Sequence, residues 1–468
     1  MKILTNKIDL LSFYIFSSFI LIWVSINSGP IDIYKFFDNF NFLLTAKLFK
    51  SSAIYTINFL RATFPIIILI INITIILYKI KDIKFINFSK NYTLVFFYIF
   101  SFFQILALVL AYDNKFFDYF YWNLLMLSIL TLFTISISLN KNINYFFYIS
   151  FFILWVVLIA YGSPTFVVFF SDTNILYESS FLNLASSTFE QPNPRVTGLS
   201  RTALLLYILH FVLFFKNYEN KYFKFINLIL FLLLSTIIIL FSSRGAIGGL
   251  LITNILFLIF FKRMNIFKKF MFFLSILLFP ILFAEGIHYY KQENLLKSEV
   301  SKELYKEQKK RHINEKYLAF ISSYAEENKR NNKYIQKMGT LTIFLSERNI
   351  FWKAIYNKAK ENLIIGFGTQ ADRKFTGMPV SQVFLYALIT GGVLSLIGLI
   401  IFLILIFKKI LILTFENKKN FLSINNYYIV VISFLIISFF TFRGLFENTF
   451  LIFGIDFLMF FQSCILLE

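Results

Sequence analysis

The residues of this sequence best suited to chemistry are five arginines at the ends of apolar segments. They are Arg195, Arg201, Arg244, Arg348 and Arg443. A guanidinium group stays charged and offers a planar fork that binds phosphate through two parallel hydrogen bonds. We therefore expect these arginines to bind an anionic ligand together. For any one of them taken alone, anchoring to lipid headgroups is the alternative.

Other groups that could support catalysis are scarce. There is one cysteine, Cys464, and the three histidines His210, His288 and His312 are too scattered for a metal site. The sequence has neither a zinc-protease motif nor a phosphate-binding loop. We therefore predict no metal and no cofactor. For His210, within the apolar stretch LLLYILHFVL, we favour a neutral histidine bonded to a neighbouring helix over a functional ionisable group.

The composition indicates that a lipid bilayer surrounds this chain. Hydrophobic residues make up 58% of its 468 residues, 66 of them are Phe, and the mean hydropathy is +0.72. So much apolar surface cannot be buried in the core of an ordinary soluble domain. The net charge of +20 fits lysine-rich cytoplasmic loops and contact with anionic lipid, so we predict no nucleic-acid partner.

Hydropathy predicts an all-α polytopic membrane protein with about twelve transmembrane helices. The expected spans lie near 10–27, 62–79, 92–112, 119–139, 145–162, 201–216, 224–241, 245–261, 268–287, 380–407, 427–442 and 448–466. The chain then divides into 1–287 with nine spans and an outer loop at 163–200, a large helical extracytoplasmic loop at 288–379, and 380–468 with three spans. The first span is expected to be a signal anchor, and 31–51 an outer amphipathic segment.

Charge sets the orientation of these spans. Lysines such as Lys81, Lys141, Lys268 and Lys418 gather in the loops on one side, and positively charged loops stay in the cytoplasm. We therefore expect both termini in the cytoplasm of a bacterial inner membrane. Of the ten arginines, only Arg263 then lies inside. Because the other arginines lie on the outer face, we expect them to bind an anionic ligand there.

The two outer loops are expected to differ in structure. In 163–200, Pro192 and Pro194 exclude regular helix, and Gly198 allows a tight turn before the sixth span. The loop 288–379 is the one sizeable water-soluble piece expected, and its first part has the composition of surface helices. In its second part we predict one amphipathic helix that ends before Gly366 and Gly368. The expected buried face of that helix contains Ile350, Ala354, Ile355 and Ala359, and Ser346 is its expected cap.

Four ordered motifs resemble the O-antigen ligase and polymerase family. SSRGAIGGLLITN at 242–254 is similar to the serine-arginine-glycine signature that begins a central span of that family, and the earlier PRVTGLSR resembles its Arg-x-x-Gly turn. SERNIFWKAIYNKAKENLIIGFG resembles its motif of an Arg, a Trp four residues later, and a helix closed by a Gly-x-Gly turn. SQVFLYALITGGVLSLIGLI resembles the Gly-rich span that follows. The likeness covers about residues 190–410.

The resemblance implies a metal-independent glycosyltransferase that uses an undecaprenyl-diphosphate-linked glycan donor on the outer face. It implies catalytic roles for Arg195, Arg244 and Arg348 in holding the diphosphate or glycan. It also implies substrate-binding roles for Arg201, Gly366, Gly368, Ser381 and Gln382. For Arg443, which lies beyond the resemblance, we expect a substrate-binding role from its position between the last two spans. The implied partners are the lipid-linked glycan, an acceptor glycan, the bilayer and a chain-length regulator.

One departure from the family favours polymerase over ligase. The ligase branch has a histidine just before the Gly-rich span, whereas this chain has Ser381 and Gln382, which are not bases at neutral pH. Nothing in the sequence places His288 there instead. We therefore expect the acceptor to be another repeat unit, with lipid A-core, the ligase acceptor, as the alternative.

Two further functions stay open. A flippase or other transporter of lipid-linked glycan would also have many spans, but it predicts internal repeats and charges deep within spans, which this sequence lacks. A glycosyltransferase with a lipid-monophosphate donor would need an acidic residue in the first outer loop, where Asp32 and Asp38 occur. Both functions rank below the polymerase or ligase.

Overall fold

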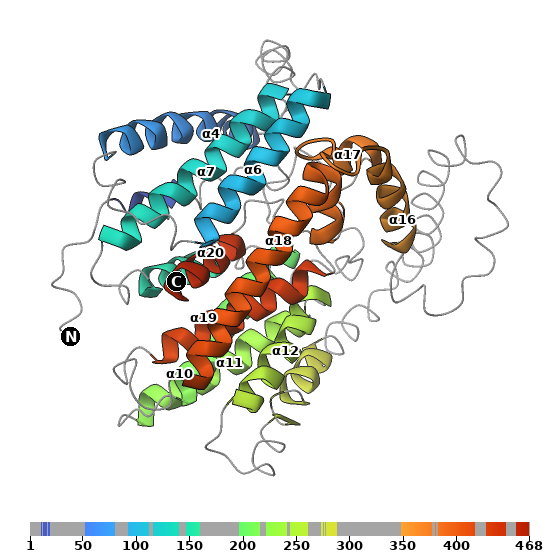
Figure 1. Cartoon of the computed structure of the whole chain (residues 1–468). Helices are drawn as coiled ribbons and strands as arrows, with labels where there is room; N and C mark the ends of the chain where they lie inside the picture. Colours follow the sequence, from blue (N-terminus) through green and yellow to red (C-terminus); the bar gives the residue numbers. More distant parts are fainter. Residues whose placement is uncertain are drawn as a thin grey trace, which may run out of the picture.

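The protein, examined as a computed structural model, is helical throughout the residues that the structure describes. These are 52–79, 92–111, 116–139, 147–159, 196–215, 221–240, 244–260, 348–376, 383–416, 427–445 and 455–467, with parts of 11–18, 273–287 and 380–382. No strand occurs among them. The predicted all-helical class is therefore confirmed for this part of the chain (Figure 1).

Most of the helices coincide with apolar stretches of the sequence, and the short helices between 348 and 376 are more polar. They are α4 (Ser52–Tyr78), α6 (Tyr92–Ala111), α7 (Phe116–Leu139), α10 (Val196–Phe215), α11 (Lys221–Leu240), α12 (Arg244–Phe260), α16 (Arg348–Ala359), η4 (Lys360–Asn362), α17 (Ala371–Thr376), α18 (Val383–Glu416), α19 (Tyr427–Gly444) and α20 (Ile455–Leu467). A helix pairs its own main-chain groups, so it is the structure that an apolar segment adopts in lipid.

Three of the described helices are long and apolar enough to cross a membrane. They cover Tyr92–Leu110, Lys221–Leu240 and Val383–Ile412. Several large apolar side chains on them face outward, as Ile404 does with 60% of its surface exposed. Such outward apolar surface is what a helix in contact with lipid presents. The structure thus agrees with a membrane protein, while the predicted count of twelve spans stays a prediction.

The helix α10 corrects the expected start of its span. The predicted loop extended to residue 200 with a turn at Gly198, but α10 begins at Val196 and contains Gly198. Proline excludes helix mainly by lacking an N–H and by restricting the residue before it, so a helix can begin soon after Pro194. A glycine in the first turn costs only about 1 kcal/mol relative to alanine, which the buried residues that follow can offset.

Three other boundaries differ from the expected ones. The helix α4 begins at Ser52, ten residues earlier than the span predicted from 62. The helix α18 continues to Glu416, past the expected end at 407, and α19 extends to Gly444 and so includes Arg443, which we had placed between spans. Hydropathy marks where apolar residues stop, but a helix continues through Lys408 and Lys409 because long basic side chains reach toward water.

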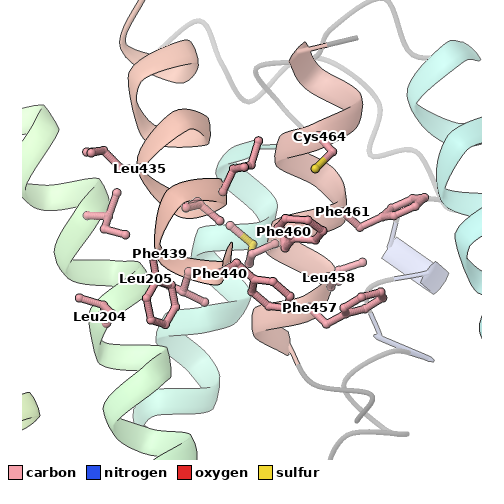
Figure 2. Close-up of a cluster of buried hydrophobic side chains, with 14 of the residues drawn as sticks. Leu204, Leu205, Leu435, Phe439, Phe440, Phe457, Leu458, Phe460, Phe461 and Cys464 are labelled. Carbon is pink, nitrogen blue, oxygen red and sulfur yellow. The ribbon is translucent and has the colours of Figure 1, made fainter. Parts of the chain in front are cut away.

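The centre of the molecule is an apolar layer between α10, α19 and α20. Figure 2 shows Leu204 and Leu205 of α10 facing Phe439 and Phe440 of α19, with a row of α20 aromatic side chains behind them. The rings of Phe440 and Phe460 stack at 4.3 Å between centroids. Cys464, the single cysteine, is buried in this layer. Packing of this kind fixes α10 against α19, and both helices carry candidate arginines.

Candidate functional site

A close contact among three helices lies at the base of the candidate site. Gly249 of α12 packs so tightly between α10 and α19 that an added Cβ would lie 2.5 Å from Leu204 Cδ2 and 2.4 Å from Phe439 Cδ2. Beside it, a Cβ on Gly248 would lie 2.8 Å from Phe442 Cε1. Gly248 and Gly249, the last two residues of GAIGG, therefore let α12 approach its neighbours, as small residues do in membrane helix packing.

The three helices have defined relative directions. Tyr207 of α10 donates a hydrogen bond to Asn254 of α12 over 2.6 Å, further along both helices than the Leu204–Gly249 contact, so α10 and α12 are parallel. On α12, Gly248 lies beside Phe442 of α19, and the next residue, Gly249, lies beside Phe439. Residue numbers therefore rise along α12 while they fall along α19, so α19 is antiparallel to α10 and α12. Figure 1 shows the three helices side by side.

These directions bring three candidate arginines to one end of the bundle. Arg201 precedes Leu204 by three residues, Arg244 precedes Gly249 by five, and Arg443 follows Phe439 by four. At 1.5 Å of rise per residue, all three main-chain positions lie about 4–8 Å beyond the contact, on the same side. The main-chain positions of Arg201, Arg244 and Arg443 therefore lie at one end of this bundle, and the shared binding site expected of the five arginines stays a prediction.

The surroundings of these arginines differ. Arg443 is almost fully buried, with 4% of its surface exposed, whereas Arg201 is half-buried, and both side chains have interaction partners. Arg244 is the first residue of α12, so its main-chain N–H stands at the positive end of the helix dipole. An anion near this end of the bundle would therefore meet positive charge from more than one helix.

The remaining predicted arginines are placed differently. Arg195 directly precedes α10 in sequence but lies outside the described residues. Arg348 is the first residue of α16, a helix that packs against α17 and α18. On the buried face of α16, Ile355 and Ala359 are 1% and 0% exposed, which confirms that part of the predicted amphipathic pattern. Arg348 thus belongs to a second group of elements.

This second group is held together where a turn meets a break in α18. The turn after η4 contains Gly366 and Gly368, and α18 is broken at Gly391 and Gly392, where the backbone leaves helical values.

Hydrogen bonds join the turn to this break. Phe367 N–H donates to the carbonyl of Ile389 over 2.8 Å, and Gly368 N–H donates to the carbonyl of Thr390 over 2.8 Å. In the reverse direction, Val393 N–H donates to Leu363 over 2.8 Å. The turn therefore replaces helical hydrogen bonds that the break removes.

Only glycine fits at these contacts. Gly366 has a φ of +80°, and a Cβ there would lie 2.6 Å from the main-chain nitrogen of Gly392. Gly368 has a φ of +89° and packs against Leu108 of α6. Positive φ and close approach of two main chains both favour glycine. The structure thus gives Gly366 and Gly368 a packing role, and their predicted substrate-binding role stays a prediction.

A buried polar cluster that we did not predict from the sequence follows the turn. Asn123 of α7 donates to the Thr369 hydroxyl over 2.8 Å, and that hydroxyl donates to Gln104 Oε1 of α6 over 2.9 Å. All three side chains are at most 4% exposed. Two of these residues could have been found from the sequence, because Gln104 and Asn123 are single amides within the apolar stretches SFFQILAL and YWNLLML.

Two residues that follow this cluster in sequence, Gln370 and Asp372, are buried. Gln370 adopts a φ of 59°, uncommon for a residue other than glycine. The Oδ2 atom of Asp372 accepts a hydrogen bond from Val380 N–H over 2.7 Å. The carbonyl of Gln382 accepts from Tyr386 N–H over 3.0 Å, so Gln382 stands at the start of α18. Ser381 lies outside the described residues.

His210 has the structural role that we favoured. Trp155 Nε1–H donates to His210 Nε2 over 3.0 Å, so Nε2 carries no proton and the ring is neutral. His210 Nδ1 then donates to Asn227 Oδ1 over 2.8 Å. Two neighbouring helices are joined to α10 by these bonds. Within the described part of the chain, no cluster of three or more His, Cys, Asp or Glu residues could hold a metal ion, and His288 lies outside it.

Comparison with known proteins finds no family model that matches this chain and no curated protein that matches it. The function is therefore argued from the site and from the motif resemblance.

Proposed function

We propose that this protein is a membrane glycosyltransferase that polymerises undecaprenyl-diphosphate-linked glycan repeat units on the periplasmic face of the bacterial inner membrane. The observation that carries the proposal is the gathering of Arg201, Arg244 and Arg443 at one end of the α10, α12 and α19 bundle. In the proposed topology there are twelve spans, both termini are cytoplasmic and 288–379 is periplasmic. The arginine end then faces the side where lipid-linked glycans are assembled.

The arginines suit the charge change in this reaction. The acceptor hydroxyl oxygen forms a bond to the anomeric carbon of the donor sugar and releases its proton to water, and the bond from that carbon to the diphosphate oxygen breaks. The diphosphate leaves with the electron pair, so its negative charge rises in the transition state. Preorganised guanidinium groups in a site of low dielectric stabilise that added charge. In our proposal Arg195, Arg244 and Arg348 hold the diphosphate or glycan, and Arg201 and Arg443 support them.

The acceptor is proposed to be a second repeat unit. Ser381 and Gln382 occupy the position where the ligase branch has a histidine, and neither side chain accepts a proton at neutral pH. Deletion of the gene should leave lipid A-core capped by a single unit where a separate ligase is present. Long polymer stranded on the carrier lipid, together with bare core, would instead identify a ligase. Gel analysis of lipopolysaccharide with extraction of carrier lipids separates the two.

Charge-conserving variants test the arginine site. Arg244→Lys keeps a cation but loses the two-point fork, so polymer formation should fall severely at normal protein level, as it should in Arg244→Ala. Arg443→Lys should also reduce polymer. Arg263→Lys is the matched control, because Arg263 is the one arginine predicted on the cytoplasmic side, and it should retain wild-type polymer. Wild-type activity of both Arg244 variants would reduce that residue to a headgroup anchor.

The orientation of the arginine end has its own test. In a Cys464→Ala background, a cysteine at Asn332 should react with a membrane-impermeant thiol reagent in cells with a permeabilised outer membrane. A cysteine at Asn417 should stay unlabelled until the inner membrane is opened. The reverse pattern would place the arginines in the cytoplasm and remove the basis of the proposal.

A further inference from the structure

We infer that the turn at residues 363–369 lies inside the bilayer, with Leu363 and Ile364 in contact with lipid acyl chains. The sequence alone predicts that this segment belongs to a water-soluble loop. The inference concerns the leaflet at the Val383 end of α18, which is the outer leaflet in the proposed topology. It rests on the depth of the turn, its main-chain pairing and its surface, and it does not depend on glycan chemistry.

The depth follows from the position of the turn along α18. The hydrocarbon core is about 30 Å thick, which an α-helix crosses in about 20 residues. Lys408 and Lys409 mark the far boundary, since cationic side chains end at the interface. Counting back about 20 residues from Lys408 reaches the region of Leu388. The near boundary of the hydrocarbon core therefore lies close to Leu388. The turn meets α18 at Gly391 and Gly392, which lie on the hydrocarbon side of this near boundary. If α18 is tilted, more of its residues lie in the hydrocarbon core, and the near boundary moves further toward Val383.

Main-chain pairing makes this depth tolerable. Non-helical backbone at membrane depth is tolerated only where the backbone itself is buried in the protein or lines a water-filled cavity, and Gly366 and Gly368 of the turn are buried. Here the N–H groups of Phe367 and Gly368 bond to α18, and the carbonyl of Leu363 accepts from Val393. Gly366 N–H bonds to the carbonyl of Asn362 over 2.9 Å, and the Asn362 side chain donates back to the Gly366 carbonyl over 2.6 Å.

The surface of the turn continues the lipid-facing surface of α18. An apolar stripe runs along α18 through Leu394, Ile397, Ile401 and Ile404, each 43–60% exposed. The 363–369 turn sits at the upper end of this stripe, beside Gly392 and Val393, and presents Leu363 and Ile364 with 42% and 68% exposed. Lipid acyl chains are the apolar partner expected to cover two adjacent exposed aliphatic side chains beside a membrane-spanning helix.

The charges next to the turn are arranged for the headgroup layer. Lys360 Nζ lies 4.6 Å from the ring centre of Tyr356, back along α16 and away from Ile364. Lys358 lies 4.9 Å from the ring centre of Phe375 and pairs with Glu361. Lysine and tyrosine at this level are typical of the interface between acyl chains and headgroups, where anionic lipid attracts the ammonium groups.

Fluorescence quenching in vesicles tests the placement. The full-length protein carrying Cys464→Ala and Ile364→Cys is labelled with an environment-sensitive dye and reconstituted into phosphatidylethanolamine and phosphatidylglycerol. Two quenchers are compared, aqueous iodide and a lipid with a nitroxide near the head of its acyl chain. Leu363→Cys serves as a second reporter, and both side chains are exposed, so labels leave the core intact. Ile404→Cys, on the same apolar stripe of α18 and four residues before Lys408, is the lipid control, and Lys353→Cys, exposed on α16, is the aqueous control.

The expected result is strong quenching of both reporters by the nitroxide lipid and protection from iodide, with a ratio close to that at Ile404. A ratio that groups with Lys353 at both reporters would overturn the inference and place the turn in water. Because the assay has no activity readout, that outcome would leave the proposed glycosyltransferase function to be judged by its own arginine variants.

Discussion

A β-carbon on Gly392 would lie 2.1 Å from the carbonyl oxygen of Ile364, far inside van der Waals contact. The two residues belong to different segments, the helix α18 and the turn that follows α16 and η4. Their contact couples the break in α18 to the end of α16, and α16 begins with Arg348. The position of Arg348 therefore depends on two glycines in a neighbouring helix.

Replacing Gly392 should separate these elements. Gly392→Ala introduces a clash with Ile364 and a side chain at a φ of +67° and ψ of −164°, a backbone region almost confined to glycine. We expect the free energy of unfolding to fall by about 2–5 kcal/mol from strain and overpacking together. The thermal unfolding midpoint of the purified protein in detergent measures the change.

Gly398 provides the matched control for this substitution. It lies in the same helix, and a Cβ there meets nothing within 4 Å. Gly398→Ala should leave the midpoint unchanged or raise it slightly, because alanine favours helix over glycine by up to about 1 kcal/mol. Equal midpoints for Gly392→Ala and Gly398→Ala would show that the turn does not dock on α18 as described.

The packing of the arginine bundle can be probed at Gly249. Gly249→Ala places a methyl group 2.4 Å from a Phe439 carbon, so α10, α12 and α19 must move apart. We expect a loss of about 1–3 kcal/mol in the free energy of unfolding, typical of overpacking, together with reduced polymer formation. Gly286→Ala, where a Cβ would meet nothing within 4 Å, should change neither quantity. If Gly249→Ala behaves like Gly286→Ala, the close three-helix contact is absent.

The all-helical class could be predicted from the sequence because it depends on local patterns, whereas the shared site of the arginines stays a prediction. Apolar runs mark the helices, and a residue at the end of a run lies at the end of its helix, as Arg244 does. Gly198 was misread as a turn because proline and glycine restrict a helix start only weakly. Local propensity is overridden there by the packing of the residues that follow.

The docking of the turn on α18 was beyond prediction from local patterns. Thr369 and Gln104 are 265 residues apart in sequence, and nothing in either segment specifies the partner. The Gly-x-Gly and Gly-Gly pairs were visible, but each alone indicates only a turn or a flexible helix. Their complementarity, with Gly366 packed on Gly392, arises from tertiary contact between two surfaces.

His210 should be dispensable for catalysis but not for stability. His210→Leu leaves the Trp155 N–H and the Asn227 side chain without the partner that joins them to α10. We expect the free energy of unfolding to fall by about 1–3 kcal/mol for the unpaired buried groups. Polymer formed per molecule of folded protein should equal that of the wild type. Loss of polymer at normal protein level and unchanged unfolding midpoint would instead give His210 a catalytic role.

The Thr369 hydroxyl links α6 and α7 to the turn, so its removal should loosen the turn selectively. Thr369→Val keeps the shape of the side chain but removes the acceptor for Asn123 and the donor for Gln104. The free energy of unfolding should fall by about 1–3 kcal/mol, because two buried amides lose their partner. Thr369→Ser retains the hydroxyl and should recover most of that loss, which a thermal unfolding series in detergent measures. Equal midpoints for the valine and serine variants would mean that packing of the methyl group, and not the hydrogen-bonded cluster, holds the turn against α6 and α7.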